Sequence, residues 1–258
     1  ARPDRLALQV ARLDAEPDLD VLGSRVEFLD DGLARNAGMR AYVEWSNSLL
    51  THEEIVADLL VESPLAHPSV TMRSAALRRL GGYRAFDGPE DYDLWLRARE
   101  AGCRFAKLPE ALLRWRDSPS RLSRTDARYA ADRFFGLKVD FFARTTPHGE
   151  AVVVWGAGPI GKAWARALRA RGRGVAAFVE VDPRKIGGRI HGAPVLAVDG
   201  AGALSGAIHL AAVGRRDARE RIRADIDANG LNNWGRIESW EAAYRETPGM
   251  CQLAVQHR

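Results

Sequence analysis

Apolar positions in the first half of the chain change their spacing from segment to segment. Leu6, Val10 and Leu13 lie three or four residues apart, which predicts a helix over residues 3–14. An apolar stretch then predicts a strand over residues 20–29. The same patterns predict further helices over residues 51–60, 74–80 and 89–101, and strands over residues 69–72 and 103–107. Alternating helices and strands are typical of the α/β class.

A short polar stretch separates this half from the next. Residues 126–144 predict a long amphipathic helix, and residues 145–149 are polar and contain a proline and a glycine. Strands are then expected over residues 151–155, 174–181 and 207–213, with helices over residues 162–171 and 218–228. We therefore expect two domains, residues 1–145 and 150–245, of which the second is a small Rossmann-like unit with a parallel sheet.

The composition is that of a globular protein. Hydrophobic residues make up 46% and charged residues 28% of the 258 positions. No apolar run approaches the roughly 18 residues of a membrane-spanning helix, and no signal-peptide pattern follows Ala1. Cys103 and Cys251 are too few for a disulfide framework or a cysteine-built zinc site. We therefore expect a cytoplasmic protein, with peripheral contact to a membrane left open.

The net charge is +4, and the basic residues are almost all arginines. Of 38 basic residues four are lysines, which leaves 34 arginines. Arginine binds phosphate through a bidentate fork, so the bias fits partners that carry phosphate, although genomic base composition is the alternative explanation. Acidic residues are interspersed among the arginines, so no basic stripe for nucleic acid is indicated.

Three acidic side chains cluster at the predicted start of the helix over residues 89–101. They are Glu90, Asp91 and Asp93. The positive end of the helix dipole stabilises negative charge there, so the cluster by itself needs no catalytic explanation. Its meaning depends on the segments around it.

Several segments resemble, in the same order, the acceptor-side half of family-two glycosyltransferases. They lie at residues 67–73, 80–83, 90–97, 108–116 and 121–123. The ordered set is specific and covers roughly residues 1–125. The resemblance implies a partial GT-A-like mixed sheet with helices, and transfer of a sugar from a nucleotide diphosphate donor to an acceptor hydroxyl. The partners that it implies are a nucleotide-sugar and an acceptor glycan or lipid.

The resemblance also implies roles for individual acids and aromatics. The second acid of the pair is usually the general base in the family, which maps onto Asp91, and Glu90 would then orient Asp91 or the acceptor. Such a base takes the proton of the attacking hydroxyl. Trp95 matches part of a sugar-facing wall, with burial in the core as the alternative.

Basic side chains extend the site that the resemblance implies. Arg114, Arg116 and Arg121 occupy the region in which relatives place basic groups near the donor diphosphate, and arginine–phosphate bonds are charge-assisted. His67 lies in the donor and acceptor region. The alternatives are solvated surface arginines and a structural histidine.

The metal-binding half of the family has no match in the chain. Family-two enzymes carry a nucleotide-binding β-α-β half and an Asp-x-Asp motif for magnesium or manganese. Residues 2–9 resemble the segment that follows this motif, and residues 30–38 are interpreted as a loop. We therefore expect the chain to begin downstream of the metal site, assign no metal ligands, and expect no sugar transfer by this chain alone.

A glycine-rich turn is the main feature of the second domain. Gly156, Gly158 and Gly161 form a G-x-G-x-x-G pattern between a predicted strand and a predicted helix. Glu180 and Asp182 end the next predicted strand, 19 and 21 residues beyond Gly161, close to the spacing of a ribose-binding carboxylate. The pattern predicts a nucleotide site with the phosphate at the helix N-terminus, and an intact fold with an empty site is the alternative.

Two functional hypotheses follow. Residues 182–187 and 190–195 resemble the small Rossmann-like domain that precedes sugar acyltransferases and can hold a nucleotide-sugar. The first hypothesis is a glycosyltransferase acceptor half, with Asp91 as base, fused to such a domain. The second is a nucleotide-binding regulatory or oxidoreductase module, of NAD(P) or nucleotide-sugar type, with an inert first half.

Overall fold

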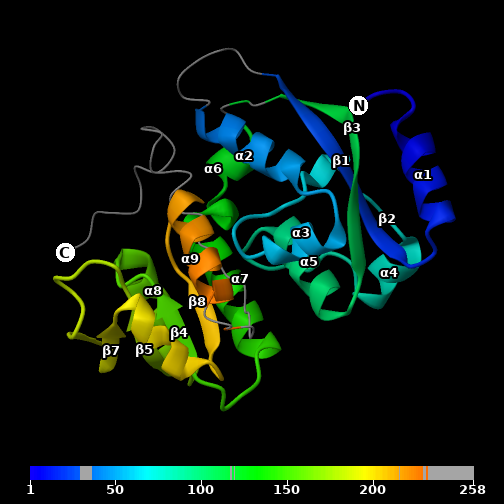
Figure 1. The fold of residues 1–258 in the computed structure, drawn as a ribbon. Coiled ribbons are helices and arrows are strands. Elements are labelled where there is room, and N and C mark those ends of the chain that lie inside the picture. The colour runs from blue at the N-terminus through cyan, green and yellow to red at the C-terminus, as the bar shows by residue number, and fades with distance from the viewer. Residues whose placement is uncertain (30–36, 117, 119, 215, 229–230, 232–258) are drawn as a thin grey trace. The chain divides into compact units, whose positions relative to one another are not determined.

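The computed structural model describes residues 1–29, 37–116, 118, 120–214, 216–228 and 231 (Figure 1). These residues fall into two compact units, Ala1–Phe135 and, up to residue 231, Gly136–Ala242. Each unit is an α/β structure with its own sheet. The α/β class predicted from the sequence is therefore confirmed.

The first unit contains a three-stranded mixed sheet. Its strands are β1 (Leu19–Leu29), β2 (Thr71–Met72) and β3 (Arg104–Arg116), in the order β2-β1-β3. β1 pairs antiparallel with β2 and parallel with β3. Because β1 is the central strand of the sheet, it buries consecutive side chains such as Val21 and Leu22 rather than alternate ones.

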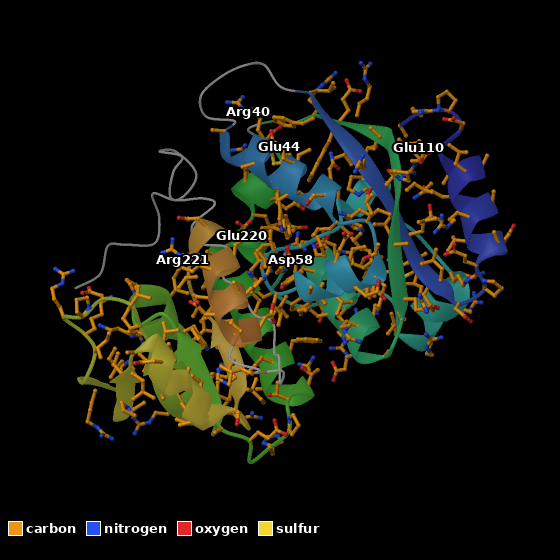
Figure 2. The ribbon with its side chains drawn as sticks, in the orientation of Figure 1. Arg40, Glu44, Asp58, Glu110, Glu220 and Arg221 are labelled. Carbon is orange, nitrogen blue, oxygen red and sulfur yellow. The ribbon has the colours of Figure 1, made fainter. Side chains whose placement is uncertain are left out.

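β3 is much longer than the predicted strand over residues 103–107 because it continues through a proline. The register against β1 passes from Ser24–Leu108 to Arg25–Ala111. Pro109 and Glu110 fall in the gap, so the missing amide hydrogen of the proline costs no bond to β1. Glu110 is labelled beside β3 in Figure 2. The bulge could not be read from periodicity, which the proline interrupts.

The longer helices of the first unit are α1 (Arg5–Ala15), α2 (Ala37–Ser48), α3 (His52–Ala57), α4 (Ser74–Arg79) and α5 (Glu90–Glu100). Of these, α1, α2 and α3 contact the strands of the sheet. Leu13 of α1 packs with Leu19 and Leu22, and Met39 and Val43 of α2 pack with Val26. Shorter helical segments follow at η2 (His67–Ser69), α6 (Leu122–Thr125) and η3 (Ala127–Tyr129).

Helix α2 was not predicted from the sequence. The loop expected over residues 30–38 lies outside the described residues except for its last two positions, and α2 begins there at Ala37. Only Met39, Val43 and Ser46 of this helix are buried, so its apolar stripe is short. Trp45 on the same helix donates from Nε1 to Asp58 at 2.8 Å.

The second unit contains a five-stranded sheet in the order β6-β7-β5-β4-β8. The strands are β4 (Val152–Trp155), β5 (Val175–Val179), β6 (Arg189–Ile190), β7 (Ala193–Leu196) and β8 (Ile208–Ala211). All pairings are parallel except that of the short edge strand β6. The helical segments are α7 (Ala131–Thr145, from Gly136 onward), α8 (Pro159–Arg169), η4 (Val198–Leu204) and α9 (Arg216–Ala228).

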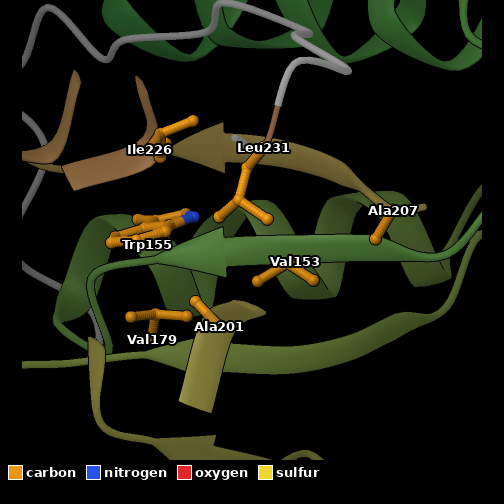
Figure 3. Packing of buried hydrophobic residues seen from close by; sticks show 7 residues of the cluster. All are labelled: Val153, Trp155, Val179, Ala201, Ala207, Ile226 and Leu231. Atoms are coloured by element: carbon orange, nitrogen blue, oxygen red, sulfur yellow. The ribbon is translucent and has the colours of Figure 1, made fainter. Parts of the chain in front are cut away.

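Both faces of this sheet are covered, as parallel sheets require. Val153 and Trp155 of β4 point into a cluster with Val179, Ala201, Ala207, Ile226 and Leu231 (Figure 3). On the opposite face, Val154 lies against Gly161 at the start of α8. This arrangement is Rossmann-like, as predicted.

The division between the units lies earlier than the predicted linker. It falls between Phe135 and Gly136, inside α7, whereas the linker was expected at residues 145–149. Independent folding of the predicted domains stays a prediction, and residues 232–245 of the second domain lie outside the described residues. Within the described ranges, no helix is long and apolar enough to cross a membrane.

Candidate functional site

The acidic cluster at the start of α5 separates into three side chains with different surroundings. Asp93 is buried and forms an ion pair at 2.7 Å with Arg97, one turn further along the helix. Arg97 also donates to the backbone carbonyls of Leu80 at 2.7 Å and Gly82 at 2.9 Å. Asp93 therefore has a structural role, because it neutralises the arginine that holds the loop before α5.

Asp91, like Glu90 beside it, is partly exposed to solvent. Its side chain is 19% exposed, and its Oδ2 lies 4.0 Å from Nδ1 of His67. Its Oδ1 accepts the backbone N–H of Tyr92 at 2.7 Å. Burial raises the pKa of Asp91 above its ordinary value, and the nearby His67 and the Tyr92 amide oppose that shift. The result is a carboxylate that binds a proton more readily than an exposed aspartate.

His67 connects Asp91 to an exposed tyrosine. Its Nε2 lies 2.8 Å from the hydroxyl of Tyr83, and the two ring centroids are 5.5 Å apart. The His67 ring also meets Trp95 edge-on at 6.1 Å. Trp95 is only 1% exposed, so the structure favours the core interpretation of this side chain over direct contact with a sugar.

Glu90 is held by a second tyrosine. The hydroxyl of Tyr129, in η3, donates to Oε2 of Glu90 at 2.7 Å. Burial raises the pKa of Tyr129, and the bond to Glu90 adds to the shift, because losing the phenolic proton would place two negative charges together. Sequence reasoning missed both Tyr83 and Tyr129. Tyr83 lies in a segment that carried the family resemblance, whereas no signal marked Tyr129.

The three predicted arginines are not brought together. Arg114 pairs with Glu27 at 3.1 Å, and the guanidinium of Arg121 lies 4.6 Å above the ring of Trp115. Side chains alternate between the two faces of a strand, so Arg114 and Arg116 share one face of β3 and Trp115, with Arg121 over it, has the other. A single phosphate-binding fork of all three is therefore not formed here.

Family-two glycosyltransferases are expected to use a divalent metal, although the sequence assigned no ligands for it in this chain. In the part of the chain that the structure describes, no group of three or more His, Cys, Asp or Glu side chains is gathered as metal ligands. The described residues therefore do not fit a metal site, and no chemical step is assigned to a metal.

The three glycines of the turn after β4 differ in what a side chain would meet at each position. Gly156 has a φ of +104°, and a side chain there would lie 2.7 Å from Val213. At Gly161 a Cβ would lie 1.9 Å from the carbonyl oxygen of Gly156, so only glycine allows α8 to approach β4. A Cβ at Gly158 would meet nothing within 4 Å, which leaves open space before α8. α8 begins without a capping side chain.

The acids predicted for ribose binding are already engaged within the protein. Glu180 accepts the amide of Ala157 at 3.1 Å and the amine of Lys185 at 2.9 Å on one oxygen. Its other oxygen accepts the backbone N–H of Val181 at 2.9 Å. Burial by itself would raise the pKa of Glu180, but these bonds outweigh it and hold the pKa below its ordinary value. Glu180 therefore ties the glycine turn to the end of β5.

Asp182 is paired in a similar way. Its carboxylate accepts hydrogen bonds from the side chain of Arg184 at 2.9 and 3.0 Å, which lower the pKa of Asp182 to about 2. Sequence reasoning missed this pairing. Arg184 and Lys185 follow the two acids by a few residues, and basic side chains at that spacing could have indicated it. A ribose hydroxyl would have to share or displace these bonds.

Two curated proteins are similar to this chain. One is named "Putative glycosyltransferase EpsE", from Bacillus subtilis (strain 168), and is 31% identical over 133 residues, or 50% of this chain and 44% of that protein. The other, "Uncharacterized glycosyltransferase" from Haemophilus influenzae, is 29% identical over 140 residues, or 53% and 49%. The chain spans about half the length of the curated relatives it matches. No protein-family model matches it.

A comparison with solved structures matches the chain to RSP, a Rex-family repressor. The crystal structure of RSP is 15% identical with a TM-score of 0.30, covering 62% of this chain and 77% of that one. The complex of RSP with β-NAD⁺ and operator DNA is 12% identical with a TM-score of 0.31, covering 68% and 93%. These TM-scores are too low to transfer a ligand or a function.

Proposed function

We propose that the first unit is the acceptor-side part of a family-two glycosyltransferase with a GT-A-like fold, and that Asp91 is its general base. The observation that carries the proposal is the Asp91 carboxylate, which is partly buried, still 19% exposed, and raised in pKa. The similarity to two proteins named as glycosyltransferases supports the reaction class. The substrates are then a nucleotide-sugar donor and a glycan or lipid acceptor.

Asp91 acts on the acceptor in this reaction. The acceptor hydroxyl attacks the anomeric carbon of the donor sugar while its proton passes to the Asp91 carboxylate. The new carbon–oxygen bond forms as the bond to the nucleotide diphosphate breaks, and the diphosphate leaves with the electron pair. A base positioned in this way contributes about 10²- to 10⁴-fold to the rate. The raised pKa of Asp91 makes its carboxylate a better acceptor for that proton.

Replacing Asp91 tests the assignment in the full-length enzyme. Asp91→Asn is expected to lower turnover by about 10²-fold or more, because an amide cannot take the proton. The melting temperature should stay level or rise, since the neutral amide avoids the cost of burying a charge. Turnover is followed as release of UDP or GDP from a panel of nucleotide-sugars.

Asp93→Asn is the matched control on the same helical turn. It removes the charge that neutralises the buried Arg97, so it should cost about 3 kcal/mol of unfolding free energy. Asp91→Asn should therefore lose turnover and keep its stability, whereas Asp93→Asn should lose stability. Undiminished turnover in Asp91→Asn would contradict the role of Asp91 as the base.

For the second unit we propose a site for a nucleotide-sugar at the glycine turn. The open space at Gly158 and the uncapped start of α8 support it, since both suit a phosphate group. The engaged state of Glu180 speaks against a ribose held as in NAD-dependent enzymes. Calorimetric titration should show binding of a UDP-sugar in preference to NAD or NADP. Tight binding of nicotinamide nucleotides alone would favour the oxidoreductase alternative.

A further inference from the structure

Tyr83 is a large aromatic side chain that stays exposed beside the proposed base. It is 48% exposed, whereas Tyr92 and Trp95 on the neighbouring helix are at most 1% exposed. Its hydroxyl is hydrogen-bonded to Nε2 of His67, and Nδ1 of the same imidazole lies 4.0 Å from Oδ2 of Asp91. A single imidazole thus joins the exposed ring and the carboxylate.

The loop that carries Tyr83 is held in place by buried charge. Gly81 and Gly82 have φ values of +76° and +68°, which side chains rarely adopt. Arg97 binds the carbonyl of Gly82 and is itself neutralised by Asp93. Buried ion pairs add little net stability, but this one fixes the backbone next to Tyr83. The orientation of the exposed ring is therefore set from both ends, by its loop and by His67.

We propose that Tyr83 is the aromatic wall of the acceptor subsite, against which the apolar face of a pyranose ring stacks while one of its hydroxyls points to Asp91. This inference rests on the proposed function of the first unit. An aromatic ring with an apolar face and one hydrogen-bonded polar end suits a sugar, which has both C–H faces and hydroxyl edges. Tyr83 is a specificity-determining residue here, and His67 positions it.

Binding of simple pyranosides tests the proposal without turnover. The probes are methyl β-D-glucopyranoside, methyl α-D-mannopyranoside and methyl N-acetyl-β-D-glucosaminide, observed by saturation-transfer-difference NMR. The unaltered protein should bind at least one of them. Tyr83→Phe keeps the ring and should weaken binding no more than about 3-fold, whereas Tyr83→Ala should weaken it about 10-fold, as loss of one aromatic contact predicts.

Two controls separate this proposal from its alternatives. Leu122→Ala removes another exposed apolar side chain, 60% exposed, and should leave pyranoside binding unchanged. Asp91→Asn should retain most pyranoside binding while losing turnover, so failure of the base assignment and failure of the Tyr83 assignment give different results. Thermal melting should show Tyr83→Ala to be folded, because its side chain is not buried.

In the full-length enzyme, Tyr83→Ala should raise KM for the acceptor about 10-fold and leave KM for the donor unchanged. If Tyr83 had only a structural role, its loss would not change KM for the acceptor while leaving KM for the donor unchanged. The proposal is overturned if Tyr83→Ala binds the pyranosides as tightly as the unaltered protein, or if the unaltered protein binds none of the three.

Discussion

Lys107 is a charged side chain that lies inside the first unit. It is 6% exposed, and its amine donates to the backbone carbonyl of Ser46 and, at 3.2 Å, to the hydroxyl of the same residue. Burial, and after it the positive charge of Arg25, lower the pKa of Lys107 to about 7, although Glu54 opposes both effects. The amine caps the end of α2 at the cost of being desolvated.

The stability of the protein should therefore rise with pH above neutrality. The pKa of this lysine is about 10.4 in the unfolded chain and about 7 in the folded one, so the unfolded state binds more protons between these values. Unfolding free energy should increase by up to about 2 kcal/mol from pH 7 to pH 9, and the increase should cease above the unfolded pKa. Below pH 7 the lysine is charged in both states and contributes no slope.

Lys107→Met isolates this contribution. Urea unfolding at pH 7, 8 and 9, compared between the variant and the unaltered protein, should show the slope only in the latter. Identical pH dependence in the two proteins would mean that Lys107 titrates in the folded state as it does in water.

At the scale of elements, the turn between β4 and α8 separates two uses of glycine. Gly161 permits close packing, because a Cβ would lie 1.9 Å from a backbone oxygen. Gly158 keeps space open outside the packed core, because a Cβ would touch nothing within 4 Å and its φ is −85°. The same motif therefore contains one position that folding requires and one that only a ligand would require.

Substitution of these two glycines should affect different quantities. Gly161→Ala is expected to lower the free energy of unfolding by about 1–3 kcal/mol through overpacking. Gly158→Val should cost no more than about 1 kcal/mol, because valine is a poor N-cap residue for α8, and should reduce the affinity for a UDP-sugar. Chemical denaturation and calorimetry measure the two quantities. Unchanged UDP-sugar affinity in Gly158→Val would place any nucleotide site elsewhere.

At the scale of the whole molecule, the division into two units assigns most of α7 to the second. Phe142 is 1% exposed and meets Trp164 of α8 edge-on at 6.1 Å. Arg171 pairs with Asp140, and Arg173 donates to the carbonyl of Thr146. The second unit thus uses residues that precede the linker predicted from the sequence, such as Asp140 and Phe142, and one residue within it, Thr146.

A fragment that begins at residue 136 should therefore be more stable than one that begins at residue 150. Both are expected to unfold cooperatively, because the sheet and its apolar cluster are common to them (Figure 3). The longer fragment should melt several degrees higher, since it keeps the buried face of α7. Phe142→Ala in the longer fragment should remove much of that gain. Equal melting temperatures for the two fragments would support the boundary at residues 145–149.

Local patterns were sufficient for many elements and for the candidate acids. The helices α1 and α3 and the strands β1, β4 and β5 follow from spacing between near neighbours in the sequence. The first-turn position of Asp91 and the glycine turn followed in the same way. Such features depend on backbone geometry within a few residues, so the sequence contains the necessary information.

The tertiary structure decided which of these side chains are available for chemistry. The sequence pattern did not show that Arg97 neutralises Asp93, or that Asp91 faces His67 across 24 positions of the chain. The sequence also did not show that the amine of Lys185 donates a hydrogen bond to Glu180, or that Tyr83 stays exposed while Trp95 is buried. Exposure, pairing and pKa depend on which distant segments pack together, and that packing is a property of the whole fold rather than of any local pattern.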